Sequence, residues 1–80
     1  MKTESKRERR PIRAKDATGQ VHNVQEVTLL RRFGYTDGTW SAWQTVSIMY
    51  LRGTDRVNLE HDGTMTVVAS GEKLTPLAPL

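Results

Sequence analysis

The stretch from Glu26 to Tyr50 decides the fold; it reads E-V-T-L-L-R-R-F-G-Y-T-D-G-T-W-S-A-W-Q-T-V-S-I-M-Y. Asp37-Gly38 near its centre is a dipeptide favoured in two-residue type I′ turns, where both residues need positive φ. That turn places Leu29 opposite Val46 and brings apolar residues together on one face, while the other face is mostly polar. One-sided burial requires such a pattern. The sequence therefore predicts a long β-hairpin over residues 26–50.

Two flanking segments, 16–20 and 60–64, predict shorter hairpins of a different kind. Glycine stands at the third loop position in both, which favours a three-residue loop with a left-handed glycine and a bulge. A further turn at Ser70-Gly71 would return the chain. These turns oppose Ile12 to Val24, Leu59 to Met65, Val57 to Val67, and Leu74 to Val67.

The predicted fold class is all-β: a small antiparallel meander of about five or six strands that forms a curled sheet or a small barrel. The strands are expected at about 11–16, 20–33, 39–51, 56–60, 64–69 and 72–75. A meander limits its exposed edges by curling. The alternative is a short helix over 21–30, where apolar residues recur at three-residue spacing. The β-branched content of that segment argues against it.

The basic charge lies at the N-terminus. The chain has a net charge of +3, but residues 1–15 hold seven cations and two carboxylates, a net of +5, which leaves −2 for the rest. Residues 1–10 have one apolar side chain, so burial cannot offset the entropy of ordering them. We expect a disordered basic N-terminal arm over 1–10 and a single small β domain over 11–80.

The composition favours a protein without catalytic chemistry. There is no cysteine and there are two histidines, so we expect no metal site, no cofactor and no enzyme activity. The chain has no long apolar run, so we expect no membrane span and a cytoplasmic protein. Since about 65 ordered residues make a lean core, either a monomer or a homodimer is expected.

Two groups of residues are candidates for binding. The aromatic and arginine-rich end of the hairpin suits a protein partner, because Trp, Tyr and Arg dominate binding hot spots; Arg32 would place its guanidinium over Trp43. The alternative is nucleic acid, with the arm on phosphates and the aromatics stacked on bases. The hairpin candidates are Arg31, Arg32, Tyr35, Trp40 and Trp43, and the arm candidates are Lys6, Arg7, Arg9, Arg10 and Arg13. Aromatic residues that simply hold a small core are the third interpretation.

Part of the chain resembles a group of small uncharacterised bacterial all-β proteins. The similarity lies in A-K-D-A-T-G-Q at 14–20 and in V-N-L-E-H-D-G-T-M-T-V-V-A-S-G-E-K-L-T-P-L at 57–77. The matching features are D-A-x-G, V-N, the D-G-T hairpin and a closing G-x-x-L. The resemblance implies a small all-β protein with no assigned activity, and no catalytic residue to carry over.

Overall fold

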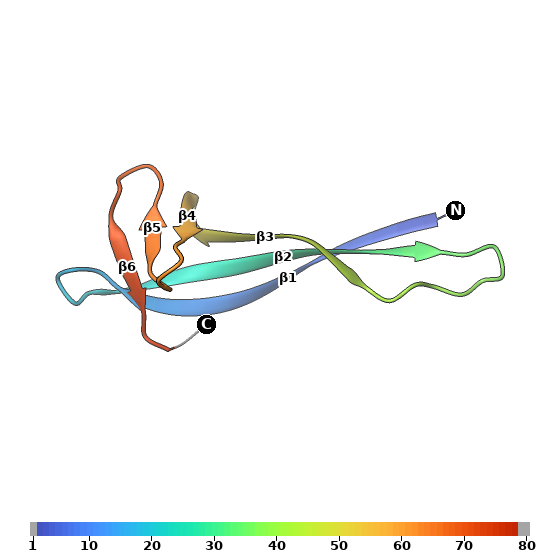
Figure 1. The fold of residues 1–80 in the computed structure, drawn as a ribbon, viewed down its shortest axis with the longest axis horizontal. Coiled ribbons are helices and arrows are strands. Elements are labelled where there is room, and N and C mark those ends of the chain that lie inside the picture. Colours follow the sequence, from blue (N-terminus) through green and yellow to red (C-terminus); the bar gives the residue numbers. More distant parts are fainter. Residues whose placement is uncertain (1, 79–80) are drawn as a thin grey trace.

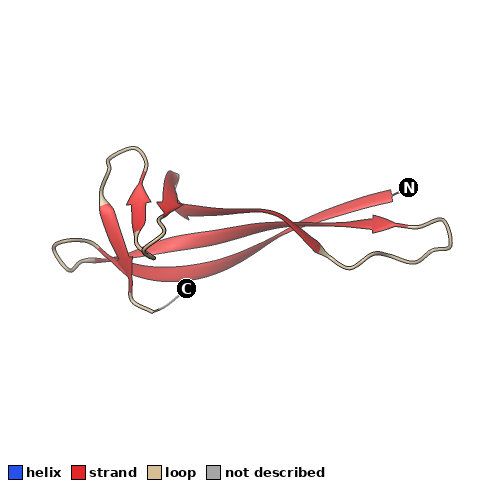
Figure 2. Ribbon diagram, in the orientation of Figure 1, coloured by secondary structure: helices blue, strands red, loops and turns tan. Residues whose placement is uncertain are grey.

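The computed structural model describes residues 2–78, and within them the protein is all-β (Figures 1 and 2). This confirms the predicted fold class. The six strands are β1 (Lys2–Lys15), β2 (Val21–Gly34), β3 (Gln44–Arg52), β4 (Asp55–Leu59), β5 (Met65–Val67) and β6 (Lys73–Pro76). In the part of the chain described, no helix is long and apolar enough to cross a membrane.

The strands form an antiparallel meander that closes on itself. Each strand pairs with the next one along the chain, and β6 returns to pair with β1 through Ala14–Pro76 and Lys15–Thr75. We call this closed end the ring. It consists of β4, β5 and β6 with residues 12–15 of β1, 21–26 of β2 and 50–52 of β3.

The ring contains the hydrophobic core. Its buried members come from every strand except β3, and Tyr50 of β3 packs against them. They are Ile12, Ala14, Val24, Val57, Met65, Val67 and Leu74. The predicted pairs Ile12–Val24, Val57–Val67 and Leu59–Met65 are confirmed. The predicted opposition of Leu74 to Val67 is wrong: Leu74 lies opposite Met65.

The longest strands continue far beyond the ring. Residues 2–11, 27–34 and 44–49 of β1, β2 and β3 form a three-stranded extension, which we call the ribbon, and residues 35–43 connect β2 to β3 at its tip (Figure 1). The molecule measures 56 × 24 × 20 Å and has a radius of gyration of 16.3 Å. A compact chain of this length would have about 12 Å. The ribbon therefore projects from the ring with no second layer covering it.

The prediction of a disordered arm over residues 1–10 is wrong for the residues described. Residues 2–10 belong to β1 and pair with β2 in unbroken register, from Lys2–Gly34 to Lys15–Val21. All of residues 2–10 are exposed, so apolar burial does not order them. Backbone hydrogen bonds to β2, ion pairs and stacked side chains hold this segment instead. Met1 lies outside the described residues.

The long hairpin exists, but its turn and part of its register differ from the prediction. The loop is of the three-residue type, because Tyr35 N donates to Thr39 O and Gly38 N to Tyr35 O. Gly38 has a φ of 89°, whereas Asp37 has none of the positive φ that a type I′ turn demands. The same hydrogen-bond pattern closes the loops at 16–20 and 60–64, as predicted.

A bulge changes the pairing farther along the hairpin. Arg31 lies opposite Gln44 and Leu30 opposite Thr45, as predicted, but Leu29 lies opposite Ser47. Val46 is the extra residue on β3. The predicted pair Leu29–Val46 is therefore wrong, because a bulge shifts every pair beyond it by one residue.

Candidate binding surface

Stacked cations and indoles link β1, β2 and the connecting segment 35–43 near the tip of the ribbon. The Arg32 guanidinium carbon lies 4.5 Å from the centre of the Trp40 ring and 4.7 Å from that of Trp43. Lys6 Nζ lies 4.4 Å from the centre of the Trp43 ring. These are cation–π contacts, and the predicted contact of Arg32 with Trp43 is confirmed. We call Glu4, Lys6, Arg32, Trp40 and Trp43 the tryptophan clasp.

Glu4 holds Arg32 within the clasp, and Gly34 makes room for the Trp40 ring. The Glu4 carboxylate accepts hydrogen bonds from Arg32 Nε, at 2.8 Å, and from Arg32 Nη2. A Cβ added at Gly34 would lie 3.0 to 3.3 Å from atoms of the Trp40 ring. Glycine therefore lets the indole cover the backbone closely. Because Glu4 and Lys6 belong to β1, the clasp fixes the outer strand to the hairpin.

The two faces of the β1–β2 pair differ in charge. Side chains alternate between faces along a strand, and the register pairs odd with odd positions and even with even throughout. The even positions of the two strands mix cations with the carboxylates Glu4, Glu8 and Glu26. The odd positions of both strands carry no carboxylate, and their cations are Arg7, Arg9, Arg13, Lys15 and Arg31. We call this odd-numbered side the cationic face.

The cationic face also has an apolar row along β2. Val27 is buried and lies opposite Arg9, and Leu29 is half-buried and lies opposite Arg7; Phe33, beyond Arg31, is also half-buried. In contrast, Arg7, Arg9 and Arg31 are exposed. The charged groups are therefore accessible, while their neighbours make the face partly apolar.

On the opposite face, near the ring, the charge of Arg10 is balanced by that of Glu26. The Glu26 carboxylate accepts hydrogen bonds from Arg10 Nη2 and from the Tyr50 hydroxyl, both at 3.1 Å. Burial raises the pKa of the Tyr50 hydroxyl, and its hydrogen bond to Glu26 acts in the same direction. Arg10 is thus engaged within the molecule and does not join Arg7, Arg9 and Arg13.

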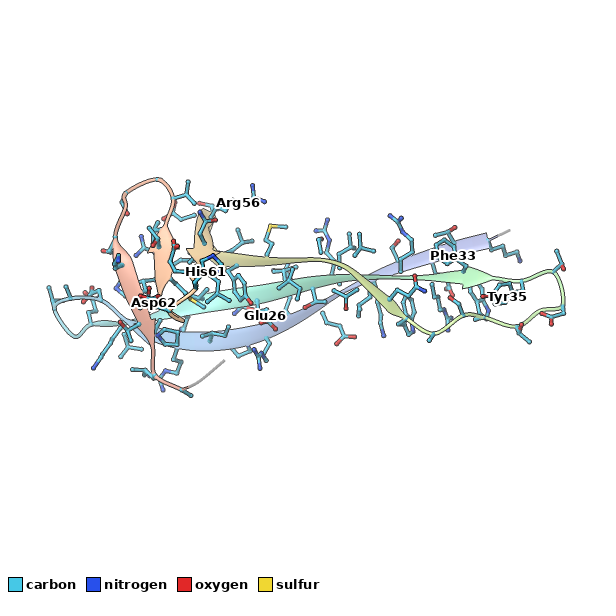
Figure 3. The ribbon with its side chains drawn as sticks, in the orientation of Figure 1. Glu26, Phe33, Tyr35, Arg56, His61 and Asp62 are labelled. Atoms are coloured by element: carbon cyan, nitrogen blue, oxygen red, sulfur yellow. The ribbon has the colours of Figure 1, made fainter. Side chains whose placement is uncertain are left out.

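An open groove of about 360 Å³ lies at the tip of the ribbon. Lys2, Tyr35 and Trp40 are among the residues that line it. Tyr35 is 56% exposed and Trp40 is 37% exposed. Figure 3 shows Phe33 and Tyr35 near this tip, whereas His61 and Asp62 lie at the ring, at the opposite end of the molecule. The groove therefore has an accessible aromatic lining.

The histidine and aspartate side chains near the ring stabilise loops. Asp16 accepts from the Thr18 backbone and hydroxyl and contacts His22 Nε2 at 2.9 Å; the hydrogen bond from His22 is the main reason that the pKa of Asp16 is lowered. Asp62 accepts from the Thr64 backbone and hydroxyl. Within residues 2–78, no group of three or more His, Cys, Asp or Glu side chains could hold a metal ion.

The structure thus separates the predicted site residues into four places. Arg32, Trp40, Trp43 and Lys6 meet in the clasp; Arg31, Arg7, Arg9 and Arg13 share the cationic face; Tyr35 lies at the tip groove and Arg10 pairs with Glu26. The parts played by Glu4 and Lys6 in the clasp were not predicted from the sequence. The signal was present in the segment K-T-E-S-K-R-E-R-R, where the acids occupy only even positions, as in a strand with one cationic face.

Comparisons of the chain with protein-family models, curated proteins and solved structures found no match. The resemblance to small bacterial all-β proteins stays a prediction.

Proposed function

We propose that the protein is a non-catalytic nucleic-acid-binding module whose cationic face contacts phosphate groups. The observation that carries the proposal is the arrangement of Arg7, Arg9, Arg13 and Arg31 on one face of β1 and β2, with no carboxylate on that face of either strand. Arginine donates bidentate hydrogen bonds to phosphate. Cations placed on a paired strand also lose less conformational freedom on binding than they would on a flexible arm.

The spacing of the arginines suits a sugar–phosphate backbone. Alternate residues on a strand are about 6.7 Å apart, so the row from Arg7 to Arg13 is about 20 Å long. Duplex DNA has one charge per about 1.7 Å of axis. Each guanidinium in the row can therefore reach a phosphate without bending the nucleic acid.

The width of the ribbon favours binding that does not depend on sequence. Three strands place their outer backbones about 10 Å apart before side chains are added. The major groove is about 12 Å wide and admits a helix or a two-stranded ribbon. The ribbon is thus too broad to insert, and phosphate contacts position a protein without reading bases.

Binding of the intact chain to a fluorescent mixed-sequence oligonucleotide, followed by anisotropy at several salt concentrations, tests this proposal. Four phosphate contacts predict that log K falls against log salt with a slope of about −3.6 for duplex DNA. The double variant Arg7→Gln/Arg9→Gln should bind more weakly and should reduce the magnitude of that slope by about 1.8.

The matched control is Arg56→Gln/Lys73→Gln, which removes the same charge from exposed positions on the ring. It should keep the salt slope of the unmodified chain. Equal effects of the two double variants would show that only net charge matters and would contradict a site on the cationic face. Absence of binding at low salt would reject nucleic acid as the ligand.

The tip groove supports a second candidate, a protein partner that contacts the hairpin end. Within residues 2–78, Tyr35 is the most exposed of the large apolar and aromatic side chains, at 56%, and aromatic anchors in pockets dominate protein interfaces. The clasp tryptophans suit this role less well, because Lys6 and Arg32 already stack on them. Capture of a partner by the intact chain, lost with Tyr35→Ala and kept with Arg7→Gln/Arg9→Gln, would favour this candidate.

A further inference from the structure

The outer edge of β1 is open along the whole ribbon. Residues 2–12 pair with β2 on one side, and within residues 2–78 no strand pairs with them on the other. β6 covers only the far end of this edge, where it pairs with Ala14 and Lys15 and where Leu77 N donates to Arg13 O. An open strand edge is a template for pairing with a further strand.

The backbone groups that face the open edge belong to odd-numbered residues. Arg13 O faces the β6 side, whereas Asp16 N, at an even position, donates to Gln20 O on the β2 side. This direction alternates along an antiparallel strand, and β1 pairs with β2 in unbroken register. The N–H and C=O groups of Thr3, Ser5, Arg7 and Arg9 therefore point outward.

The charges beside these groups have a self-complementary order. The segment K-T-E-S-K-R-E at 2–8 has lysine, glutamate, lysine and glutamate at its even positions. Read in the opposite direction, the series runs glutamate, lysine, glutamate and lysine. An antiparallel second copy with Ser5 opposite Ser5 would thus place Lys2 opposite Glu8 and Glu4 opposite Lys6.

We infer that residues 2–8 of β1 pair with residues 2–8 of a second copy, as antiparallel strands about a two-fold axis at Ser5. Charges usually discourage pairing at an open edge, but here opposite charges meet at every even position. At the odd positions Thr3 lies opposite Arg7, so no like charges meet on either side of the sheet. The contact also closes, because both copies use the same surface.

The neighbouring registers oppose like charges. With the axis at Glu4 the two Glu4 side chains face each other, and with the axis at Lys6 the two lysines do. With the axis at Arg7 two arginines meet, and Pro11, which has no N–H to donate, lies opposite Thr3. The order of residues 2–8 therefore specifies the axis at Ser5.

The charged side chains are accessible to a second copy. Arg32 donates both of its hydrogen bonds to Glu4 Oε1, so Glu4 Oε2 can accept from Lys6 of the second copy. The side chains of Lys6 and Glu8 are 42% and 61% exposed. Each charged group can therefore make the intermolecular contact without leaving the ribbon.

The rest of the fold leaves room for this pairing. The second copy covers only residues 2–8, all of which are unpaired on their outer side. In each copy the contact with β6 begins at Arg13, which would lie beyond Lys2 of the other copy. The tip segment 35–43 continues β2 rather than β1, so it is one strand away from the incoming β1.

The pairing places the cationic faces of both copies on the same side of one continuous sheet, because residues directly opposite each other point to the same side. Only this consequence bears on the proposed function; the pairing itself requires no nucleic acid. One strand from each copy buries less than the about 1,200 Å² of a stable interface. We therefore expect a dimer that dissociates on dilution and weakens with added salt.

Sedimentation equilibrium of the intact chain at low salt, without nucleic acid and at concentrations up to about 1 mM, tests the inference. We expect a shift from monomer to dimer. Glu8→Lys places lysines opposite each other at both ends of the contact and should weaken association about tenfold or more. The matched control, Glu60→Lys, makes the same charge change at an exposed position of the ring and should dimerise like the unmodified chain.

A charge exchange tests the axis. Lys2→Glu alone should also weaken the dimer, whereas Lys2→Glu/Glu8→Lys should restore it. A mixture of the two single variants should form heterodimers, because every introduced charge then faces its opposite. A folding defect would not be rescued in this way. A monomer at every concentration, a Glu8→Lys dimer as strong as the unmodified one, or a failed exchange would overturn the inference.

Cross-linking identifies the residue on the axis. Directly opposite residues in a hydrogen-bonded pair have Cα atoms about 5.5 Å apart, within the range that a disulfide spans. The chain has no cysteine, so Ser5→Cys should give a disulfide-linked dimer on mild oxidation, and the turn variant Ser70→Cys should not. Equal cross-linking of both variants would contradict pairing at Ser5. Binding by Arg7→Gln/Arg9→Gln tests the nucleic-acid proposal separately.

Discussion

The ring and the ribbon are built from the same strands but are held together by different forces. The buried core lies in the ring, where Met65, Val67, Val24 and Leu74 are fully buried. The ribbon relies on backbone ladders, the tryptophan clasp and ion pairs, each of which contributes about 1 kcal/mol or less at an exposed site. A single strand can thus be ordered by burial at one end and by cross-strand pairing at the other. Stability and binding are thereby assigned to different ends of the molecule.

The largest expected effect comes from the ring. Leu74→Ala should lower the free energy of unfolding by about 2–5 kcal/mol, because it removes a fully buried side chain from a small core. A domain of this size has only about 4–12 kcal/mol in total. Urea denaturation measures the loss. Leu77→Ala, at a half-exposed position, should cost less than about 0.5 kcal/mol. Similar losses for both variants would contradict a core confined to the ring.

A smaller and local effect is expected in the ribbon. Trp43→Ala removes the contacts with Lys6 and Arg32, worth about 1–2 kcal/mol together. Native-state hydrogen exchange should become faster for the amides of residues 3–7, and should change little in the ring. Tyr35→Ala, outside the clasp, should leave those amides unchanged. An equal loss of protection in both regions would mean that ring and ribbon unfold as one unit.

The smallest expected effect is on the pH dependence of stability. Hydrogen bonds, chiefly from His22 and Thr64, hold the pKa values of Asp16 and Asp62 below the ordinary value. The stabilisation is therefore complete above about pH 4, the ordinary pKa of an aspartate, and is lost as the pH falls further and these carboxylates take up protons.

Variants separate the ring loops from the tip in this experiment. Asp16→Asn and Asp62→Asn should flatten the acid limb of stability measured by thermal melting between about pH 2 and 6. Hydrogen bonds from Thr39 lower the pKa of Asp37 too, but Asp37 lies in the tip loop of the ribbon. Asp37→Asn should leave global melting unchanged. A change as large as that of Asp16→Asn would show that the tip contributes to global stability.

The sequence predicted the ring well because hydrophobicity and turn chemistry agree there. Val57 and Val67 are placed opposite each other by a glycine that must adopt positive φ, and the core needs both. The ribbon was harder to predict from the sequence. Residues 1–10 were expected to be disordered because they have almost no apolar side chains to bury, but residues 2–10 are ordered by pairing with β2 rather than by burial. Glu4 and Glu8 both stand at even positions, which would leave one face of a strand free of carboxylates. This pattern was the better signal that the segment is a strand.

The register error in the long hairpin has a physical cause. Matching of apolar residues favours the register without a bulge, whereas the structure pairs Leu29 with Ser47 and Thr28 with Ile48. Nothing in Q-T-V-S-I-M marks Val46 as the bulged residue. The clasp was predicted only in part for a related reason. Arg32 and Trp43 are close in the hairpin, but Lys6 reaches Trp43 only through the pairing of β1 with β2.

The closure of the ring has a consequence for the order of folding. Ala14 and Pro76 are 62 residues apart in the chain, since 76 − 14 = 62, yet they pair directly. Joining segments so distant costs about 4 kcal/mol of chain entropy, since the cost grows with the logarithm of loop length. The hairpins form between neighbours and carry a much smaller cost. We therefore expect the meander to assemble first and β6 to reach β1 last. Because Leu74 of β6 is fully buried in the core, the final closure and the completion of the core are one kinetic event.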